Sequence, residues 1–307
     1  MKIENWEIHH IPVLLEEVLE VFDPKPGQIY IDATVDGGGH AVAIARRVAP
    51  EGKVIGIDWD CDLIKELGIR NKERKAKNIE LICDNYVNIR KIAEDQGVKR
   101  VDGILFDLGF SSYHVEASGR GFSFLKNEPL DMRYNPEVND LTAEYIVNQW
   151  PQPELEEILK RYGEERFARR IAAGIARART EKRITRVAQL GEIIVNSVPG
   201  AYRRGRLHPA TRTFQALRIA VNRELENIGE GLANSWKSLG AGGVVAAISF
   251  HSLEDRLVKQ FFHSRVKAGE AALLTPRPLG PSREEQNQNP RARSAKLRAI
   301  RKIATSQ

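Results

Sequence analysis

Four aspartates follow short apolar runs in the N-terminal part of the sequence: Asp32, Asp58, Asp84 and Asp107. One acid at the end of a strand is commonplace, but four in succession suggest the rim of a ligand site, because parallel strands end at one edge of a sheet. Carboxylates at such a rim can accept hydrogen bonds from ribose hydroxyls or take a proton from a reacting amine.

A glycine turn at residues 37–39 follows the first of these aspartates. It separates the apolar run 29–33 from the segment 41–45, in the order strand, turn, helix. Glycine lets the backbone approach a ligand closely, and the free N–H groups of the next helix can face a polar or anionic group. Asp58 comes about 20 residues later, where nucleotide-binding folds place the acid that holds the ribose. The plainer alternative is a tight turn with an unrelated acid, but the combination favours a nucleoside-bearing cofactor.

Strand and helix patterns alternate along the chain up to Asp107. Strands are predicted at 53–58, 78–83, 101–107 and 243–250, helices at 10–19 and 210–239, a loop at 269–289 and a last edge strand at 291–301. Repeated βα units predict a parallel, doubly wound sheet. A long loop follows Asp107, and a basic, mostly helical region from roughly 140 to 200 interrupts the pattern.

Composition sets outer limits on class and partners. The 307 residues, with 42% hydrophobic and 29% charged, suffice for one large domain or two smaller ones. A net charge of +6 and a pI near 9.3 favour a polyanionic partner. Cys61 and Cys83 are the only cysteines, so no disulfide framework or metal site is expected, and a reducing cytoplasm fits best. No membrane-spanning run or signal peptide is visible.

Eight longer sequence motifs carry a resemblance to a known family. They are 12–16 (PVLLE), 107–112 (DLGFSS), 120–124 (RGFSF), 129–133 (PLDMR), 162–167 (YGEERF), 208–218 (HPATRTFQALR), 249–256 (SFHSLEDR) and 289–298 (NPRARSAKLR). In this order they resemble the bacterial ribosomal RNA small subunit methyltransferase H family over nearly the whole chain.

The resemblance implies a Rossmann-like class I S-adenosylmethionine-dependent methyltransferase sheet with an inserted α-helical domain. Residues 1–135 and 208–307 would form the two parts of the core, and residues 136–207 a substrate-recognition domain. The implied enzyme transfers a methyl group from S-adenosylmethionine to the exocyclic N4 of a decoding-centre cytosine in 16S ribosomal RNA, within the small ribosomal subunit. The sequence does not indicate an oligomeric state.

The resemblance also implies site residues, position by position. Cofactor contacts fall on Gly38, Gly39, His40, Asp58, Tyr86, Asp107 and His114. Asp107, Ser111 and Ser112 are the candidate catalytic residues, because an acceptor on the N4–H helps to localise a lone pair that is delocalised into the ring. Strand-end capping is their plainer interpretation. RNA contacts are expected at Asp131, Arg133, Arg203, Arg204, Arg206, His208, Arg212, His251, Arg291 and Arg293.

The chain departs from the family pattern at three positions in or near the cofactor site. Asp36 replaces the first glycine of the family's turn, Ala41 replaces its serine, and His114 stands where glutamine is usual. Aspartate tolerates left-handed backbone angles but adds charge near a cofactor. One alternative is therefore a non-catalytic rRNA-binding assembly factor with a degenerate cofactor turn. Another is an NAD-linked oxidoreductase, although the turn lacks a full G-x-G-x-x-G. The basic segments could track phosphates around one cleft or form a solvated surface.

Overall fold

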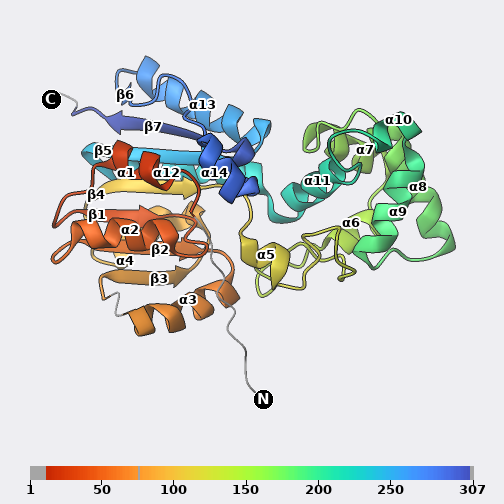
Figure 1. The fold of residues 1–307 in the computed structure, drawn as a ribbon, viewed down its shortest axis with the longest axis horizontal. Coiled ribbons are helices and arrows are strands. Elements are labelled where there is room, and N and C mark those ends of the chain that lie inside the picture. The colour runs from red at the N-terminus through yellow and green to blue at the C-terminus, as the bar shows by residue number, and fades with distance from the viewer. Residues whose placement is uncertain (1–11, 75–76, 305–307) are drawn as a thin grey trace. The chain divides into compact units, whose positions relative to one another are not determined.

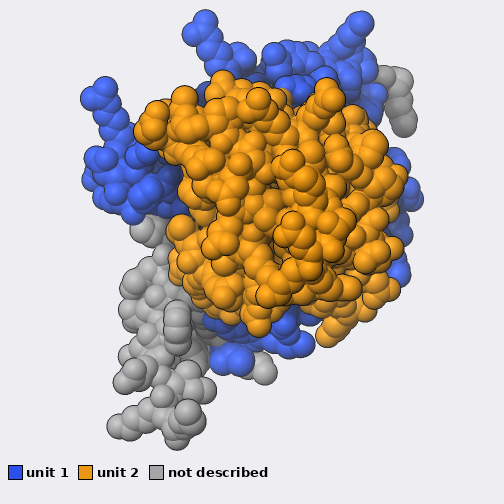
Figure 2. All heavy atoms as spheres, turned by 90° about the vertical axis from the view of Figure 1, so that its right-hand side faces the viewer, with its two compact units in different colours: residues 1–111, 225–307 blue, residues 112–224 orange. Residues whose placement is uncertain are grey.

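The computed structural model describes residues 12–74 and 77–304, which form two compact units. One unit comprises residues 1–111 and 225–307, and the other comprises residues 112–224; Figure 2 shows them in different colours. The first contains the sheet and the second is helical (Figure 1). In the described part of the chain no helix combines the length and the apolar character needed to cross a bilayer.

A seven-stranded sheet forms the centre of the first unit, in the order β3-β2-β1-β4-β5-β7-β6. Its strands are β1 (Ile29–Asp32), β2 (Lys53–Asp58), β3 (Ile79–Cys83), β4 (Val101–Asp107), β5 (Leu239–Ser249), β6 (Ala271–Leu273) and β7 (Lys296–Lys302). The pairs from β3 to β5 are parallel, and β7 runs antiparallel to both β5 and β6. The expected α/β sheet with a helical insertion is confirmed.

Helices cover both faces of the sheet because strand side chains alternate between the faces. The helices of this unit are α1 (Leu15–Phe22), α2 (Gly39–Val48), α3 (Cys61–Arg74), α4 (Ile89–Asp95), α12 (Glu224–Ser238), α13 (Ser252–Lys267) and α14 (Arg283–Gln288), with short 3₁₀ turns η1 (Tyr86–Asn88) and η2 (Pro290–Ser294). Ile31 of β1 joins a core with α4, α12 and α13. Its neighbour Tyr30 faces the other way and contacts Phe22 of α1 at a ring-centroid distance of 5.2 Å.

The structure corrects several boundaries predicted from the sequence. The long helix at 210–239 is broken at Arg223, whose left-handed backbone (φ 51°) ends α11 (Thr211–Asn222) before α12 begins. The last strand is not an edge strand, because β7 lies between β5 and β6, and its first predicted residues form η2. The expected loop 269–289 contains β6 and α14. The helix predicted from residue 10 begins at Leu15; residues 10 and 11 lie outside the described part.

A further correction concerns the two cysteines. Cys61, at the start of α3, and Cys83, at the end of β3, are joined in a disulfide. Composition alone argued against a disulfide framework. The two residues meet because α3 connects β2 to β3 and so brings its first turn beside the end of the neighbouring strand.

The second unit is built on helices α5 (Ser112–Glu116), α6 (Ala143–Gln149), α7 (Gln152–Arg161), α8 (Ala168–Glu181), α9 (Val187–Ser197), α10 (Gly200–Arg203) and α11. The predicted helical character of residues 140–200 is confirmed. Buried apolar side chains from α6 to α9 and α11 share one core with the loop residues Phe122, Leu130 and Met132. This shared core is why the compact unit extends over 112–224, beyond the 136–207 expected for an inserted domain. That the insertion recognises the substrate stays a prediction.

Candidate active site

Three of the strand-end aspartates belong to adjacent strands, at the carboxyl edge of the sheet. Asp32 ends β1, Asp58 ends β2 on one side of it, and Asp107 ends β4 on the other. Burial raises the pKa of Asp32 well above its usual range, and the charges of Asp107 and Asp58 add to the shift. Three of the four predicted strand-end acids therefore form a group of interacting carboxylates. Asp84, the fourth, follows the edge strand β3.

The glycine turn that follows β1 requires left-handed backbone at two positions. Asp36 has φ 45° and Gly38 has φ 77°. Asparagine, aspartate and glycine accept such angles most readily, so the aspartate at position 36 is compatible with the turn. Glycine is required at position 39 for steric space rather than for its backbone angle, because a Cβ built there would lie 2.9 Å from Cγ of Pro12. Its lack of a side chain makes room for the N-terminal segment.

Asp58 is held by the turn and by its own strand end. Its Oδ2 accepts from the Asp36 N–H at 3.2 Å, and its Oδ1 accepts from the Asp60 N–H at 2.8 Å. The side chain is 8% exposed. Tyr86, the expected neighbour of the adenine, packs edge to face on Phe106 with ring centroids 5.5 Å apart.

Asp107 is the most distinctive titratable group of the site. Its side chain is 5% exposed, and its backbone N–H donates to Oγ1 of Thr34 at 2.6 Å. Its Oδ2 lies 3.6 Å from Nδ1 of His40, whereas its Oδ1 is buried and has no hydrogen-bond partner among the described residues. Burial, together with the negative charge of Glu254, raises the pKa of Asp107 to about 8. A buried acceptor of this kind is available to a ligand.

His40 acts on Asp107 from the start of α2. Its Nε2 is 3.0 Å from the carbonyl oxygen of Val13. A carbonyl only accepts, so Nε2 carries a proton and, in the neutral ring, Nδ1 faces Asp107 as an acceptor. The sequence placed His40 at the cofactor but did not foresee this contact, nor the support that Thr34 gives to Asp107. Both depend on how the first helix and strand meet β4.

The charge balance of the site favours a cation. Burial also raises the pKa of Asp36 well above its usual range, and the nearby charge of Asp58 is the next largest cause. Across residues 12–74 and 77–304, Asp32, Asp36 and Asp107 form no ion pair with lysine or arginine. A positively charged ligand would relieve this repulsion. S-adenosylmethionine carries a sulfonium and an ammonium group, and the acids therefore fit this cofactor.

Other predicted site residues belong to different surroundings. Ser111 is buried in the loop after β4. Ser112 and His114 belong to the helical unit, where the His114 ring packs 4.9 Å from Phe122 and 4.8 Å from Tyr134 between centroids. Their expected roles remain predictions.

The predicted RNA contacts divide into engaged and exposed side chains. Arg133 donates to both oxygens of Asp131, at 2.8 and 2.7 Å, and to the Asn139 carbonyl. His208 stacks on Phe124 with centroids 4.6 Å apart. The remaining basic side chains are exposed or half-buried: Arg203, Arg204, Arg206, Arg212, Arg291 and Arg293. Two of them also make hydrogen bonds, Arg203 to the Val198 carbonyl at 3.2 Å and Arg212 to the Glu164 carbonyl at 2.7 Å.

His251, an expected RNA contact, has a structural role at the start of α13. It is the N-cap of α13, and its Nδ1 accepts from the Glu254 N–H at 3.4 Å. Glu254, which accepts from the Phe250 N–H at 2.8 Å, also contributes to the raised pKa of Asp107. The sequence pattern of a capping box indicates the contact between Glu254 and the start of α13. Nothing in the sequence indicates that Glu254 raises the pKa of Asp107.

Comparison with known proteins decides the family. Residues 7–303 match the MraW methylase family. The chain belongs to this family. Proteins named ribosomal RNA small subunit methyltransferase H are 44% identical to it in Syntrophotalea carbinolica, over 96% of this chain and 98% of the relative, and 44% identical in Persephonella marina, over 96% and 100%. The relative of that name from Heliobacterium mobile is 43% identical over 97% and 100%.

Membership in the MraW methylase family confirms the resemblance seen in the motifs. The sheet is a class I methyltransferase sheet, and the enzyme is an S-adenosylmethionine-dependent methyltransferase. The NAD-linked oxidoreductase is thereby excluded. Asp36, the departure that raised the possibility of a degenerate turn, has a backbone that the turn accommodates.

Proposed function

We propose that this protein transfers a methyl group from S-adenosylmethionine to the exocyclic N4 of a decoding-centre cytosine in 16S ribosomal RNA. The single observation that carries the chemistry is Asp107, a buried carboxylate at the carboxyl edge of the sheet with an acceptor oxygen free of protein partners in the described residues. The relatives' names support the class of RNA, and the family resemblance supports the cytosine N4.

Asp58 and the turn at residues 36–38 are the groups that would hold the cofactor. The bound cofactor supplies an electrophilic methyl group on a sulfonium. Asp58 would accept from the ribose hydroxyls, since two backbone N–H groups fix its carboxylate at the end of β2. The acids of the rim offset the positive charge of the ligand.

Asp107 is proposed to orient the cytosine and receive its proton. Cytosine N4 is a poor nucleophile because its lone pair is delocalised into the ring. A hydrogen bond from N4–H to Asp107 Oδ1 would localise that pair, and the ionised carboxylate would take the proton that the amine loses after attack. Thr34 Oγ1 accepts from the Asp107 N–H and so fixes the backbone at this position. Ser111 and Ser112 remain candidates for further acceptors.

The exposed arginines of residues 203–206 support an RNA substrate. Arginines of this kind neutralise phosphates, and log affinity then falls with log salt by about 0.7–0.9 for each contact. A variant with Arg203→Ala, Arg204→Ala and Arg206→Ala is expected to bind ribosomal RNA more weakly, with a shallower salt slope and the same methylation site. The parental affinity and slope in this variant would exclude the segment from the RNA footprint.

Transfer of labelled methyl groups to small subunits that lack the modification tests the whole proposal. The expected product is N4-methylcytidine at one decoding-centre position, with little product from Asp107→Ala. A label found in a different nucleoside would overturn the assignment, as would none from the parental protein. The cytoplasm, where ribosomal subunits assemble, is the proposed location. Partners beyond the 16S ribosomal RNA of the small subunit are not proposed.

A further inference from the structure

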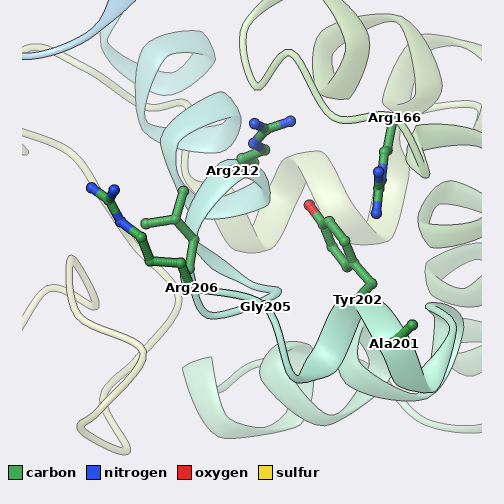
Figure 3. Close-up of a pocket in the computed structure, with 7 residues that line it drawn as sticks. Arg166, Ala201, Tyr202, Gly205, Arg206 and Arg212 are labelled. Carbon is green, nitrogen blue, oxygen red and sulfur yellow. The ribbon is translucent and has the colours of Figure 1, made fainter.

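We propose that a cavity in the helical unit is a subsite for one unpaired nucleotide of the substrate RNA. The cavity has a volume of about 310 Å³ and is lined by Arg166, Tyr202, Arg206, Leu207 and Arg212 together with two small residues. Figure 3 shows Arg206 and Arg166 on opposite sides of Tyr202 and Arg212, with the Arg206 guanidinium pointing away from Tyr202. This subsite rests on the proposed RNA substrate, and Arg166 and Tyr202 have no assigned role.

The size of the cavity selects a small ligand. Ligand pockets in proteins span roughly 300–1,000 Å³, so this one is at the lower end. A single nucleotide fits this range, whereas a duplex does not. RNA recognition commonly uses such unstacked nucleotides, because their base faces and edges are accessible.

The charge of the cavity selects an anion. Three of its lining side chains are arginines, and none is acidic. In the described part of the chain neither Arg166 nor Arg206 forms an ion pair with a carboxylate, and Arg212 donates from Nη1 to the Glu164 carbonyl at 2.7 Å. A guanidinium has five donors, so Arg212 keeps several for a phosphate.

The aromatic side of the cavity distinguishes a nucleotide from a simple anion. Arg166 lies 4.9 Å from the ring centroid of Tyr202 and 4.8 Å from that of Phe167, so its guanidinium plane is held by two rings. The Tyr202 hydroxyl donates to Glu165 Oε2 at 2.7 Å, which fixes the ring. Burial and this hydrogen bond raise the pKa of Tyr202 to about 12, so the hydroxyl stays protonated. A base can stack on such a platform of tyrosine and arginine.

Fluorescence anisotropy with the full chain and a labelled ten-nucleotide single-stranded RNA that contains the target cytosine tests the subsite. Arg206→Ala should weaken binding on the order of tenfold and reduce the salt slope by about 0.7. Tyr202→Leu should weaken binding by roughly five- to a hundredfold with an unchanged slope, because it removes stacking but no charge. Arg169→Ala is the matched control, since Arg169 is exposed and does not line the cavity. It should change affinity less than either.

Abasic substitutions scanned through the same RNA identify the stacked base. At one position, removal of the base should weaken binding of the RNA to the parental protein. The same removal should not weaken binding to Tyr202→Leu, because that variant has already lost the stacking contact. Equal losses for Arg206→Ala and Arg169→Ala, or no position that couples to Tyr202, would overturn the subsite. A ten-residue polyglutamate peptide provides a second check on specificity. If both cavity variants weaken its binding as much as they weaken RNA binding, the cavity is not a nucleotide subsite.

Two further measurements separate this subsite from the proposed function. Calorimetry with S-adenosylmethionine and circular dichroism should give parental values for all three variants, which shows that both units remain folded. Tyr202→Leu should melt at a lower temperature than the others, because it removes the hydroxyl that donates to the buried Glu165. If the variants bind RNA normally while the parental protein methylates small subunits, the subsite is wrong and the proposed function stands. If the parental protein neither binds nor methylates RNA, the proposed function fails with it.

Discussion

Asp107→Asn tests whether the buried carboxylate of the site is coupled to the charge of the cofactor. Asparagine keeps the size of the side chain and one acceptor oxygen, but it cannot ionise or take a proton. In the free protein, burial and Glu254 raise the pKa of Asp107 to about 8. At pH 7 about one tenth of the molecules therefore have an ionised Asp107, and at pH 9 about nine tenths do.

A cationic ligand binds the ionised form better, because opposite charges attract more strongly where water is excluded. If binding requires that form, the affinity of the parental protein for S-adenosylmethionine should rise about tenfold from pH 7 to pH 9 through Asp107 alone. The asparagine variant should lack this increment. Any titration of the ligand itself affects both proteins equally and cancels in their ratio.

Calorimetry at pH 7, 8 and 9 measures the binding, and single-turnover methyl transfer at saturating cofactor measures the chemistry. The variant should be slower by about 10²- to 10⁴-fold, the usual contribution of an acid–base group. Asp62→Asn, which alters an exposed acid paired with Lys65, is the control and should leave both unchanged. Parallel pH curves for the parental protein and Asp107→Asn, with similar rates, would refute the reasoning.

The stability of the protein gives an independent check on the same carboxylate. The pKa of Asp107 is higher in the folded protein than in the unfolded protein, so protonation of Asp107 stabilises the fold. This contribution to the free energy of unfolding is complete below about pH 4 and is lost as the pH rises through about 8. Asp107→Asn should therefore melt at a higher temperature than the parental protein above pH 8, and this advantage should shrink toward pH 4. A constant difference across that range would show that Asp107 does not titrate as described.

Two further substitutions test the cofactor site. Asp58→Ala should weaken S-adenosylmethionine binding by roughly 10- to 100-fold, since a charge-assisted acceptor is worth ~1.5–3 kcal/mol; unchanged calorimetry would remove Asp58 from the site. Gly231→Ala would place a Cβ 2.5 Å from Cδ2 of Tyr86, so that ring must move and cofactor affinity should fall. Gly229→Ala is its control, because a Cβ there meets nothing within 4 Å. Equal affinities for the two glycine variants would argue against Tyr86 as a cofactor contact.

The sequence by itself determined the parallel sheet and the strand-end acids. The segment 101–107 is predicted with the bounds that β4 has, because the short apolar run 104–106 suits a strand buried on both faces. The sequence motifs determined the family, because several long motifs in a fixed order are far more specific than a single glycine turn.

Only the tertiary structure decided where the chain changes direction and what the acids touch. The break at Arg223 has no proline or glycine to announce it, since arginine takes a left-handed angle there only in the context of the surrounding packing. Likewise, three properties of Asp107 depend on distances between segments far apart in the sequence. Its Oδ1 has no partner within residues 12–74 and 77–304, its pKa is high, and its Oδ2 lies near His40. Periodicity reports which face of an element is buried. The charge state of a buried acid depends on the neighbouring charges, hydrogen-bond donors and water that the fold places around it.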